Sequence, residues 1–387
     1  MHKGFFHKEQ INPSCGGICK LNKGCYSPKM PISGDGEKKI LIIGEAPEEL
    51  DDKENTQFIG LAGQLFRETL ADCEINLDQD CRKTNAVRCR PPEDRKPTIQ
   101  EIGACRQYIQ TEIERFRPAL TFLLGQVAVE SFLLGRVVSP GAIGRWRGMT
   151  IPDQKAKSWI CPIFHPAYIL RSQKGRAIRG KKQPLTPMEE LIFQADIKHG
   201  LSYLKIPFEE APTPQMIQEW DWRIESGDTI AIDYETTGLR PWRKGHRIVS
   251  VGISNGEWMW AGAMTNEVAK KWKKILVDPS IKKIAHNMKF EHQWASHCLG
   301  VETASWLWDT MLGAHMIDNR KRYCKLKHQV YINFGVPDWS GDINFGNDND
   351  DFAVKDNIVT KELLQYNALD AFWTFQLAEK QIGKFET

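Results

Sequence analysis

Acidic residues recur at regular intervals on two segments of the C-terminal half of the chain. Asp233 and Glu235 alternate on an apolar run, and strand side chains two residues apart point to the same face of a sheet. Tyr366 and Asp370 are four residues apart on a predicted helix, so they share one side of it. Hard divalent cations prefer oxygen ligands such as carboxylates. The pattern therefore predicts a site for two Mg²⁺ or Mn²⁺ ions that would serve displacement at a phosphate by water.

Cysteines are concentrated in the N-terminal part of the sequence. Seven of the ten lie between Cys15 and Cys105, and a signal peptide is not evident at the start of the chain. Cys15 and Cys19 are separated by three residues, whereas Cys89 and Cys105 are separated by fifteen. Two distant pairs that converge supply four thiolates, the ligand set of a [4Fe–4S] cluster or a structural zinc. Cys25 follows closely and is an alternative to one member of the first pair.

Composition limits the class of protein. The 387 residues include 52 Lys and Arg against 49 Asp and Glu, which gives a net charge of +3. A hydrophobic share of 41% and a charged share of 26% are ordinary globular values. Because the sequence shows neither a signal peptide nor an apolar run of the roughly 20 residues that cross a membrane, we expect a soluble cytoplasmic protein with no membrane partner. Any basic surface must be local, and Arg171 with SQKGRAIRGKK (172–182) is a predicted phosphate-contact strip.

The length predicts two α/β domains. We expect a first domain over 1–205, a proline-containing linker over 206–214, and a second domain over 215–387. In the first domain, strand and helix patterns alternate, which predicts a parallel sheet covered on both faces. The expected strands are 38–47, 83–89, 119–125 and 158–166, and the expected helices are 60–71, 98–116 and 126–134. The second domain is expected to have strands at 229–239, 246–254, 257–263 and 282–287 and a long helix at 361–382.

Four motifs of the first domain resemble a known family. They are GEAPEELDDKENTQFIGLAGQLF (44–66), NAVRCRPPEDRKP (85–97) with Cys105, LGQVAVESFL (124–133) and FHPAYILR (164–171). Their order and spacing are similar to those of family 4 uracil-DNA glycosylases, which carry a [4Fe–4S] cluster. The resemblance covers about residues 15–205. It implies a three-layer α/β/α sandwich with a central parallel sheet.

The resemblance also implies roles for particular residues. Uracil excision requires a flipped base in a pocket with an aromatic face, an amide and a hydrogen-bond donor for the charge that develops on the base. The matching residues are Phe58, Asn85 and His165. The loop after the first strand would position water and shape the sugar site, and its matched residues are Glu45, Ala46 and Asp51.

This sequence departs from the family pattern at several of these positions. Glu48 stands where the family has Gly, and Asn55 replaces another Gly. Asp51 is shorter than the usual Glu, and Asp94 replaces an Asn. The first cysteine pair is also spaced by three residues rather than two. A domain that binds DNA without excising uracil is therefore the alternative prediction.

The second domain resembles another family. DYETTGL, HNMKFE, WDTMLGAHMID (308–318) and YNALD are similar to motifs of the DEDD superfamily of 3′–5′ exonucleases, in the subgroup that ends in Tyr-x-x-x-Asp. The proofreading domain of family-A DNA polymerases is the nearest resemblance, and it covers about residues 215–387. It implies an RNase H-like mixed sheet flanked by helices. The implied metal ligands are Asp233, Glu235, Asp370 and Glu291, which replaces an Asp, and Tyr366 would orient the attacking water.

Together the two domains predict a bifunctional DNA repair or replication enzyme of a virus or phage, which would act in the host cytoplasm. It would excise uracil from DNA and hydrolyse DNA from the 3′ end by two-metal catalysis. The alternatives are a proofreading-type exonuclease with an inactive glycosylase-like module, and the same nuclease chemistry on RNA. A DNA polymerase is a candidate partner, because the second domain is either free-standing or the exonuclease part of a split polymerase.

Overall fold

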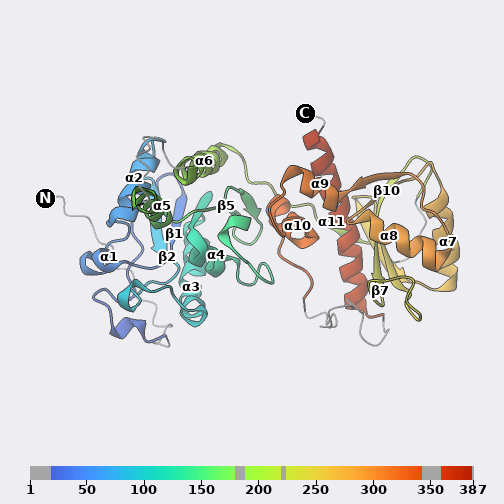
Figure 1. The fold of residues 1–387 in the computed structure, drawn as a ribbon, viewed down its shortest axis with the longest axis horizontal. Coiled ribbons are helices and arrows are strands. Elements are labelled where there is room, and N and C mark those ends of the chain that lie inside the picture. The colour runs from blue at the N-terminus through green and yellow to red at the C-terminus, as the bar shows by residue number, and fades with distance from the viewer. Residues whose placement is uncertain (1–18, 179–187, 219–223, 342–358, 386–387) are drawn as a thin grey trace. The chain divides into compact units, whose positions relative to one another are not determined.

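The computed structural model describes residues 19–178, 188–218, 224–341 and 359–385, and for residues 173–178 it describes the backbone alone. The chain divides into two compact units, Met1–Glu209 and Glu210–Thr387. The dividing point falls within the segment predicted as a linker, and the bounds of the two domains remain a prediction. Each unit has its own sheet and core (Figure 1).

The first unit is built on a five-stranded sheet of order β2-β1-β3-β5-β4. The first four are parallel, and the edge strand β4 is antiparallel to β5. The predicted parallel sheet is therefore confirmed, and the antiparallel edge strand β4 was not predicted. The strands are β1 (Ile40–Gly44), β2 (Cys81–Asn85), β3 (Leu120–Leu124), β4 (Ile151–Asp153) and β5 (Ser158–Ile163).

Helices cover both faces of this sheet, as expected for strands that are apolar on both sides. Helices α2, α5 and α6 lie on one face, and α3 and α4 on the other (Figure 1). The bounds are α1 (Glu49–Glu54), α2 (Leu61–Ala71), α3 (Ile99–Phe116), α4 (Gly125–Leu133), α5 (Pro166–Ile178) and α6 (Met188–Ser202). Short 3₁₀ turns occupy Leu21–Lys23, Pro92–Asp94, Ile143–Arg145 and Tyr203–Lys205. The predicted three-layer sandwich is thus confirmed.

The second unit has a mixed six-stranded sheet of order β11-β10-β7-β8-β9-β6. Strands β7, β8 and β9 form an antiparallel meander, whereas β10 is parallel to both β7 and β11. The strands are β6 (Gln215–Met216), β7 (Thr229–Thr236), β8 (Ile248–Ser254), β9 (Trp258–Ala263), β10 (Lys282–Ala285) and β11 (Trp306–Asp309). The helices are α7 (Asn266–Val277), α8 (Met288–Trp294), α9 (Thr310–Ile317), α10 (Leu326–Phe334) and α11 (Lys361–Phe385), with a π-helical turn at Ala295–Leu299.

Alternation along β7 decides which side chains meet which helix. Ile230, Ile232 and Tyr234 lie in the core shared with α7 and the end of α8. Ala231 packs instead against α11 on the opposite face. Asp233 and Glu235 lie two and four residues after Ala231 on the same strand, so their side chains point to the same face. Both carboxylates therefore face α11.

Glycine allows α11 to approach the sheet closely at this point. Gly252 on β8 is paired with Asp233 on β7. A Cβ atom at Gly252 would lie 2.4 Å from the carbonyl oxygen of Asn367 on α11. The bare backbone at Gly252 therefore lets the helix lie directly over β8, beside the carboxylates of β7.

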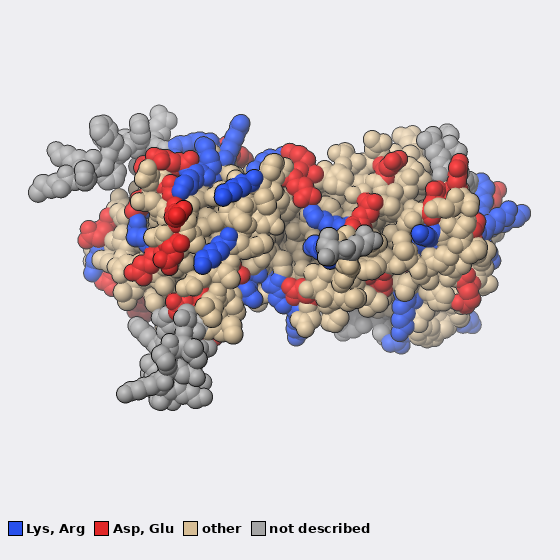
Figure 2. All heavy atoms as spheres, turned by 90° about the horizontal axis from the view of Figure 1, so that it is seen from above, with Lys and Arg blue, Asp and Glu red and all other residues tan. Residues whose placement is uncertain are grey.

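The surface carries charges of both signs. On the face drawn in Figure 2, Lys and Arg side chains are interspersed with Asp and Glu. Among the described residues, no helix is long and apolar enough to span a membrane.

Candidate active sites

Four parallel strands of the first unit deliver the predicted glycosylase residues to one edge of the sheet. Glu45 follows β1, Asn85 ends β2, and His165 lies two residues after β5. Gly125, which follows β3, is so close to His165 that a Cβ atom there would lie 2.8 Å from the histidine Cβ. The carboxyl ends of parallel strands in an open α/β sheet form a crevice that commonly binds ligands. The structure therefore brings these predicted residues together.

Asn85 and Phe58 meet over Gly44 at the end of β1. Gly44 is paired with Asn85 in the sheet. A Cβ atom on Gly44 would lie 2.3 Å from Asn85 Oδ1 and 2.8 Å from Phe58 Cζ. The amide and the aromatic ring thus occupy the space that a side chain at residue 44 would fill. Both are buried, with exposed fractions of 4% for Asn85 and 8% for Phe58.

Asp51 anchors the loop that carries Phe58. Its Oδ1 accepts a hydrogen bond from the backbone N–H of Ile59 at 3.0 Å, and its Oδ2 accepts one from Glu48 at 3.3 Å. Phe58 has a φ of 61°, which is uncommon for a residue with a side chain. The carboxylate of Asp51 is therefore used by the loop backbone, and it holds Phe58 in this conformation.

His165 is held as one tautomer. Its Nδ1 accepts a hydrogen bond from the backbone N–H of Ala167 at 3.2 Å, so in the neutral ring the proton is on Nε2. Burial, with the positive charge of Arg171, lowers the pKa of His165 to about 4. At neutral pH the imidazole is therefore uncharged and offers one N–H donor.

Glu45, Glu48 and Arg171 act electrostatically on one another near these strand ends. Burial raises the pKa of Glu45, and the charges of Lys96 and Arg171 oppose this. Burial also raises the pKa of Glu48, together with the charges of Asp51 and Asp94. Ala46 is half-buried beside Glu45. The side chains of 173–182, the rest of the predicted phosphate strip, lie outside the described residues.

Two cysteines meet at the loop after β2, and a third lies near the same arginine. Cys25 makes a thiol hydrogen bond to Cys89, and burial, with the Cys89 thiol, raises the pKa of Cys25 to about 12. Cys89 and Cys105 both act electrostatically on the buried guanidinium of Arg88. Cys15 lies outside the described residues, and Cys19 is half-buried. The segment that contacts Cys89 is thus the one that contains Cys25. The sequence predicted Cys25 as an alternative to Cys15 or Cys19.

Polar anchors hold the Cys25 segment in place. Asp52 accepts hydrogen bonds from the backbone N–H groups of Tyr26 and Ser27 at 2.9 and 2.8 Å. Arg88 donates to the carbonyl oxygen of Met30 at 2.7 Å, and the N–H of Lys29 donates to Cys89 Sγ at 3.2 Å. The Cys25 and Cys89 thiols therefore meet on backbone that these hydrogen bonds hold in place.

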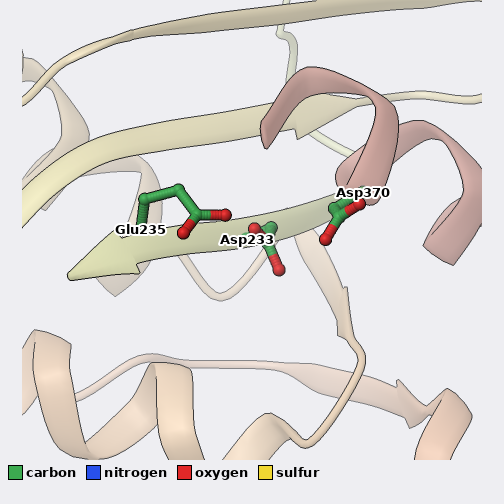
Figure 3. Close-up of side chains that lie close together, drawn as sticks. All are labelled: Asp233, Glu235 and Asp370. Atoms are coloured by element: carbon green, nitrogen blue, oxygen red, sulfur yellow. The ribbon is translucent and has the colours of Figure 1, made fainter. Parts of the chain in front are cut away.

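Three carboxylates converge in the second unit (Figure 3). Oxygen atoms of Asp233 and Glu235 from β7 and of Asp370 from α11 all lie within 4.8 Å of one another. Burial raises the pKa of all three acids, and repulsion from neighbouring carboxylates adds to the rise for Asp233 and Glu235. The positive charge of Lys327 opposes the rise at each of them. Like charges this close are stabilised by a cation. This oxygen-only donor set fits divalent metal ions.

Glu291 on α8 lies beside this group. The side chain is 3% exposed, and its Oε2 has no hydrogen-bond partner among the described residues. Burial, followed by the charge of Asp233, raises the pKa of Glu291 well above its usual value. A buried polar atom without a partner is uncommon, so an ion or a water is its expected partner.

Tyr366 and two neighbours complete the site. Lys327 on α10 donates to the Tyr366 hydroxyl oxygen at 2.7 Å and also contacts both carboxylate oxygens of Asp370. The indole N–H of Trp339 donates to Asp370 Oδ1 at 2.8 Å. The side-chain amide of Asn367 donates to Asp233 Oδ2 at 2.6 Å.

The site residues predicted from the sequence did not include Lys327, Trp339 or Asn367. Asn367 could have been found, because it lies three residues before Asp370 on the same helix. Lys327 and Trp339 come from other segments of the chain, so their spacing from the acidic residues does not indicate that they belong to the site.

Comparison with known proteins identifies both units. A family model described as uracil DNA glycosylase superfamily matches residues 31–187, and one described as 3′-5′ exonuclease matches residues 211–381. The type-4 uracil-DNA glycosylase of Thermotoga maritima is 36% identical over 150 residues, which are 38% of this chain and 76% of that protein. The N-terminal part of this chain belongs to the type-4 uracil-DNA glycosylase family. The C-terminal part is a 3′-5′ exonuclease domain.

Both domains occur together in a relative. A DNA polymerase of Bacillus phage SP01 is 27% identical over 400 residues, which are 93% of this chain and 42% of the polymerase. The chain therefore spans less than half of that relative's length. A solved structure of Brucella melitensis NrnC with bound Mg²⁺ is 22% identical, with a TM-score of 0.34, and the match covers 45% of this chain and 80% of that one.

Proposed function

We propose that this protein excises uracil from DNA with its glycosylase domain and hydrolyses DNA from the 3′ end with its exonuclease domain. The observation that carries the first activity is the placement of Phe58, Asn85 and His165 at the carboxyl ends of the parallel strands. The second activity rests on the three carboxylates contributed by β7 and α11. The phage relative favours a role in DNA repair or replication in a host cytoplasm, with a DNA polymerase as partner.

In the glycosylase domain, Phe58 offers an aromatic face to a flipped base and Asn85 offers an amide to its polar edge. His165 donates from Nε2 to the base oxygen on which negative charge develops. The N-glycosidic bond breaks with its electron pair passing to the base, and water adds to the sugar carbon, which leaves free uracil and an abasic site. The Glu45 carboxylate stabilises positive charge on the sugar as the bond breaks.

The gathered cysteines support a [4Fe–4S] cluster. We assign Cys25, Cys89 and Cys105 as ligands, with the fourth thiolate from the segment that contains Cys15 and Cys19. Such a cluster would tie the N-terminal segment to the loop after β2 and to α3. This role is structural, because the cysteines are on other elements than the crevice residues.

In the exonuclease domain, Asp233, Glu235 and Asp370 would hold divalent metal ions, and the free oxygen of Glu291 would complete their shell directly or through water. These residues would hold Mg²⁺ or Mn²⁺, which would supply water activation and charge stabilisation at the scissile phosphate. Asn367 orients Asp233, and Lys327 fixes the Tyr366 hydroxyl. Tyr366 in turn orients the water that attacks the phosphorus. The bond from phosphorus to the 3′ oxygen of the preceding nucleotide breaks, this oxygen takes up a proton, and the terminal nucleotide leaves as a 5′-monophosphate.

The first experiment uses a 5′-labelled single-stranded DNA with one internal uracil, in EDTA and in Mg²⁺. Alkali-labile cleavage at uracil in EDTA, lost in His165→Ala, is the result expected of the glycosylase. A 3′–5′ ladder in Mg²⁺, lost in Asp233→Ala, is the result expected of the nuclease. Each variant is the matched control for the other activity. A matched RNA strand tests the 2′-OH preference, and we expect DNA to be the better substrate.

The second candidate is a nuclease with an inactive, DNA-binding glycosylase domain. It is favoured by the engagement of both Asp51 oxygens by the loop backbone, which leaves this carboxylate unable to position water, and by the acid at Glu48. It predicts an intact strand in EDTA and a normal ladder in Mg²⁺.

A further inference from the structure

The loop between β7 and β8 combines an exposed aromatic side chain with positive charge. Trp242 is 61% exposed, whereas Trp272 and Trp294 in the core of the same unit are fully buried. Four cations lie on the same loop, and the sequence has no acidic residue between Glu235 and Glu257. The exposed cations are Arg240, Arg243, Lys244 and Arg247. The loop thus carries positive charge alone, whereas the face drawn in Figure 2 shows charges of both signs.

Hydrogen bonds give the loop a defined shape. The N–H of Arg243 donates to the carbonyl oxygen of Arg240 at 3.1 Å, and the N–H of His246 donates to that of Arg243 at 3.0 Å. The N–H of Arg247 also donates to Thr237 Oγ1 at 2.8 Å. The ring of His246 lies parallel to that of Trp294, with a centroid distance of 6.5 Å and an interplanar angle of 10°. The indole of Trp242 is therefore presented to solvent by an ordered turn.

The position of the loop relates it to the nuclease site. It begins directly after β7, whose Glu235 belongs to the three-acid group. Trp242 is seven positions after Glu235 in the sequence, so their Cα atoms lie no more than about 25 Å apart. A stacked strand advances about 3.4 Å per nucleotide, so at most roughly seven nucleotides separate the two positions. A strand with its 3′ end at the acids is therefore within reach of the loop.

We propose that this loop binds the single strand upstream of the 3′ end that is being hydrolysed. The indole of Trp242 stacks on a base, and the cations contact phosphates. An exposed aromatic ring flanked by cations suits single-stranded nucleic acid, because every base has a stacking face and every linkage carries a charge. The inference rests on the proposed exonuclease activity and names the strand segment that the domain holds.

The experiment measures binding of a labelled 12-nucleotide single-stranded DNA to the full-length protein in EDTA, by fluorescence anisotropy. Trp242→Ala should weaken binding at least about fivefold, whereas Trp242→Phe, which keeps a stacking ring, should retain most of it. Arg243→Ala/Lys244→Ala should lower the salt slope of log K by roughly 1.4, the value for two contacts with a single strand. The control, Lys270→Ala/Lys274→Ala, removes the same charge from exposed positions on α7.

A second readout separates this loop from the catalytic site. In Mg²⁺, Trp242→Ala should raise KM for the 12-nucleotide strand and leave kcat unchanged, because the loop contacts the strand and not the reacting phosphate. Binding within twofold of the wild type in Trp242→Ala, or an equal loss in the α7 control, would overturn the proposal. Absence of Mg²⁺-dependent hydrolysis by the wild type would instead refute the proposed nuclease, and the binding result in EDTA would still decide the role of the loop.

Discussion

The ammonium of Lys327 rests on the carboxylate of Asp370, so a lysine is built into the acidic site of the nuclease. The same ammonium donates to the hydroxyl oxygen of Tyr366. Lys327 thus balances part of the negative charge and fixes the side chain that we assign to water orientation. The positive charge of Lys327 would repel a metal ion bound at Asp370.

Lys327→Met should therefore separate metal binding from turnover. We expect Mn²⁺ to bind about fivefold more tightly, because the competing cation is gone and the interaction is partly screened. We also expect kcat on DNA to fall, because Tyr366 loses its partner. Electron paramagnetic resonance of free Mn²⁺ gives the affinity without reference to activity. Weaker Mn²⁺ binding in the variant would contradict this assignment.

Uracil excision should not require a protonated His165. The pKa of His165 is lowered to about 4, so the ring stays neutral from about pH 5 upward. Histidine-directed ¹⁵N NMR should detect a neutral ring with its proton on Nε2 at pH 5.5. The pKa of His165 is lower in the folded protein than its ordinary value of 6.5, so the unfolded chain binds the proton more readily. The contribution of His165 to the free energy of unfolding is therefore fully present above pH 6.5 and is lost as the pH falls toward 4. His165→Ala should lower kcat roughly 10²–10³-fold. An imidazolium ring at pH 5.5 would be evidence against this mechanism.

Gly44→Ala should damage uracil excision more than folding. The new methyl group would meet Asn85 Oδ1 at 2.3 Å and the Phe58 ring at 2.8 Å, so both side chains must move. We expect kcat/KM to fall about 100-fold, the size of effect that a small displacement of binding groups produces. Gly103→Ala on α3 is the control, because a Cβ atom there has nothing within 4 Å among the described residues. Equal excision by Gly44→Ala and Gly103→Ala would contradict the assignment of Asn85 and Phe58 to base binding.

Cys25→Ser should abolish or strongly reduce the iron content of the purified protein. Cys25 is the thiol that reaches Cys89, and a cluster missing one thiolate ligand is less stable. Cys73→Ser, a half-buried cysteine of the same unit on another segment, should keep its iron. Iron and sulfide analysis with visible absorption measures both variants. Full iron occupancy in Cys25→Ser would return Cys15 and Cys19 to the ligand set as a pair.

Most of the secondary structure could be predicted from the sequence because it follows from local patterns. The run ILIIG ends in glycine and forms β1, and period-two alternation placed Asp233 and Glu235 on one face of β7. The three-residue strand β4 was missed, because a strand this short has too few residues for a pattern. Contacts between segments far apart in the sequence could also not be predicted. Lys327 meets Asp370 across 43 residues, and Cys25 meets Cys89 only after the loops fold, so spacing alone did not reveal either pair.

Some side chains have tasks that their motif position did not suggest. Asp51 was matched to a water-positioning acid, yet it accepts backbone N–H groups from Glu48 and Ile59. The difference is geometric. The shorter side chain keeps the carboxylate close to its own helix start, where it takes part in a capping arrangement with Glu48.

The close approach of α11 to Gly252 also has a consequence for the order in which the two activities arise. Asn367 reaches Asp233 across 134 residues, and Asp370 follows on the same helix. During synthesis the glycosylase domain emerges first and folds without it. The nuclease gains its third acid only when α11 docks on β8. A growing chain would therefore lack the proposed nuclease activity until α11 is in place.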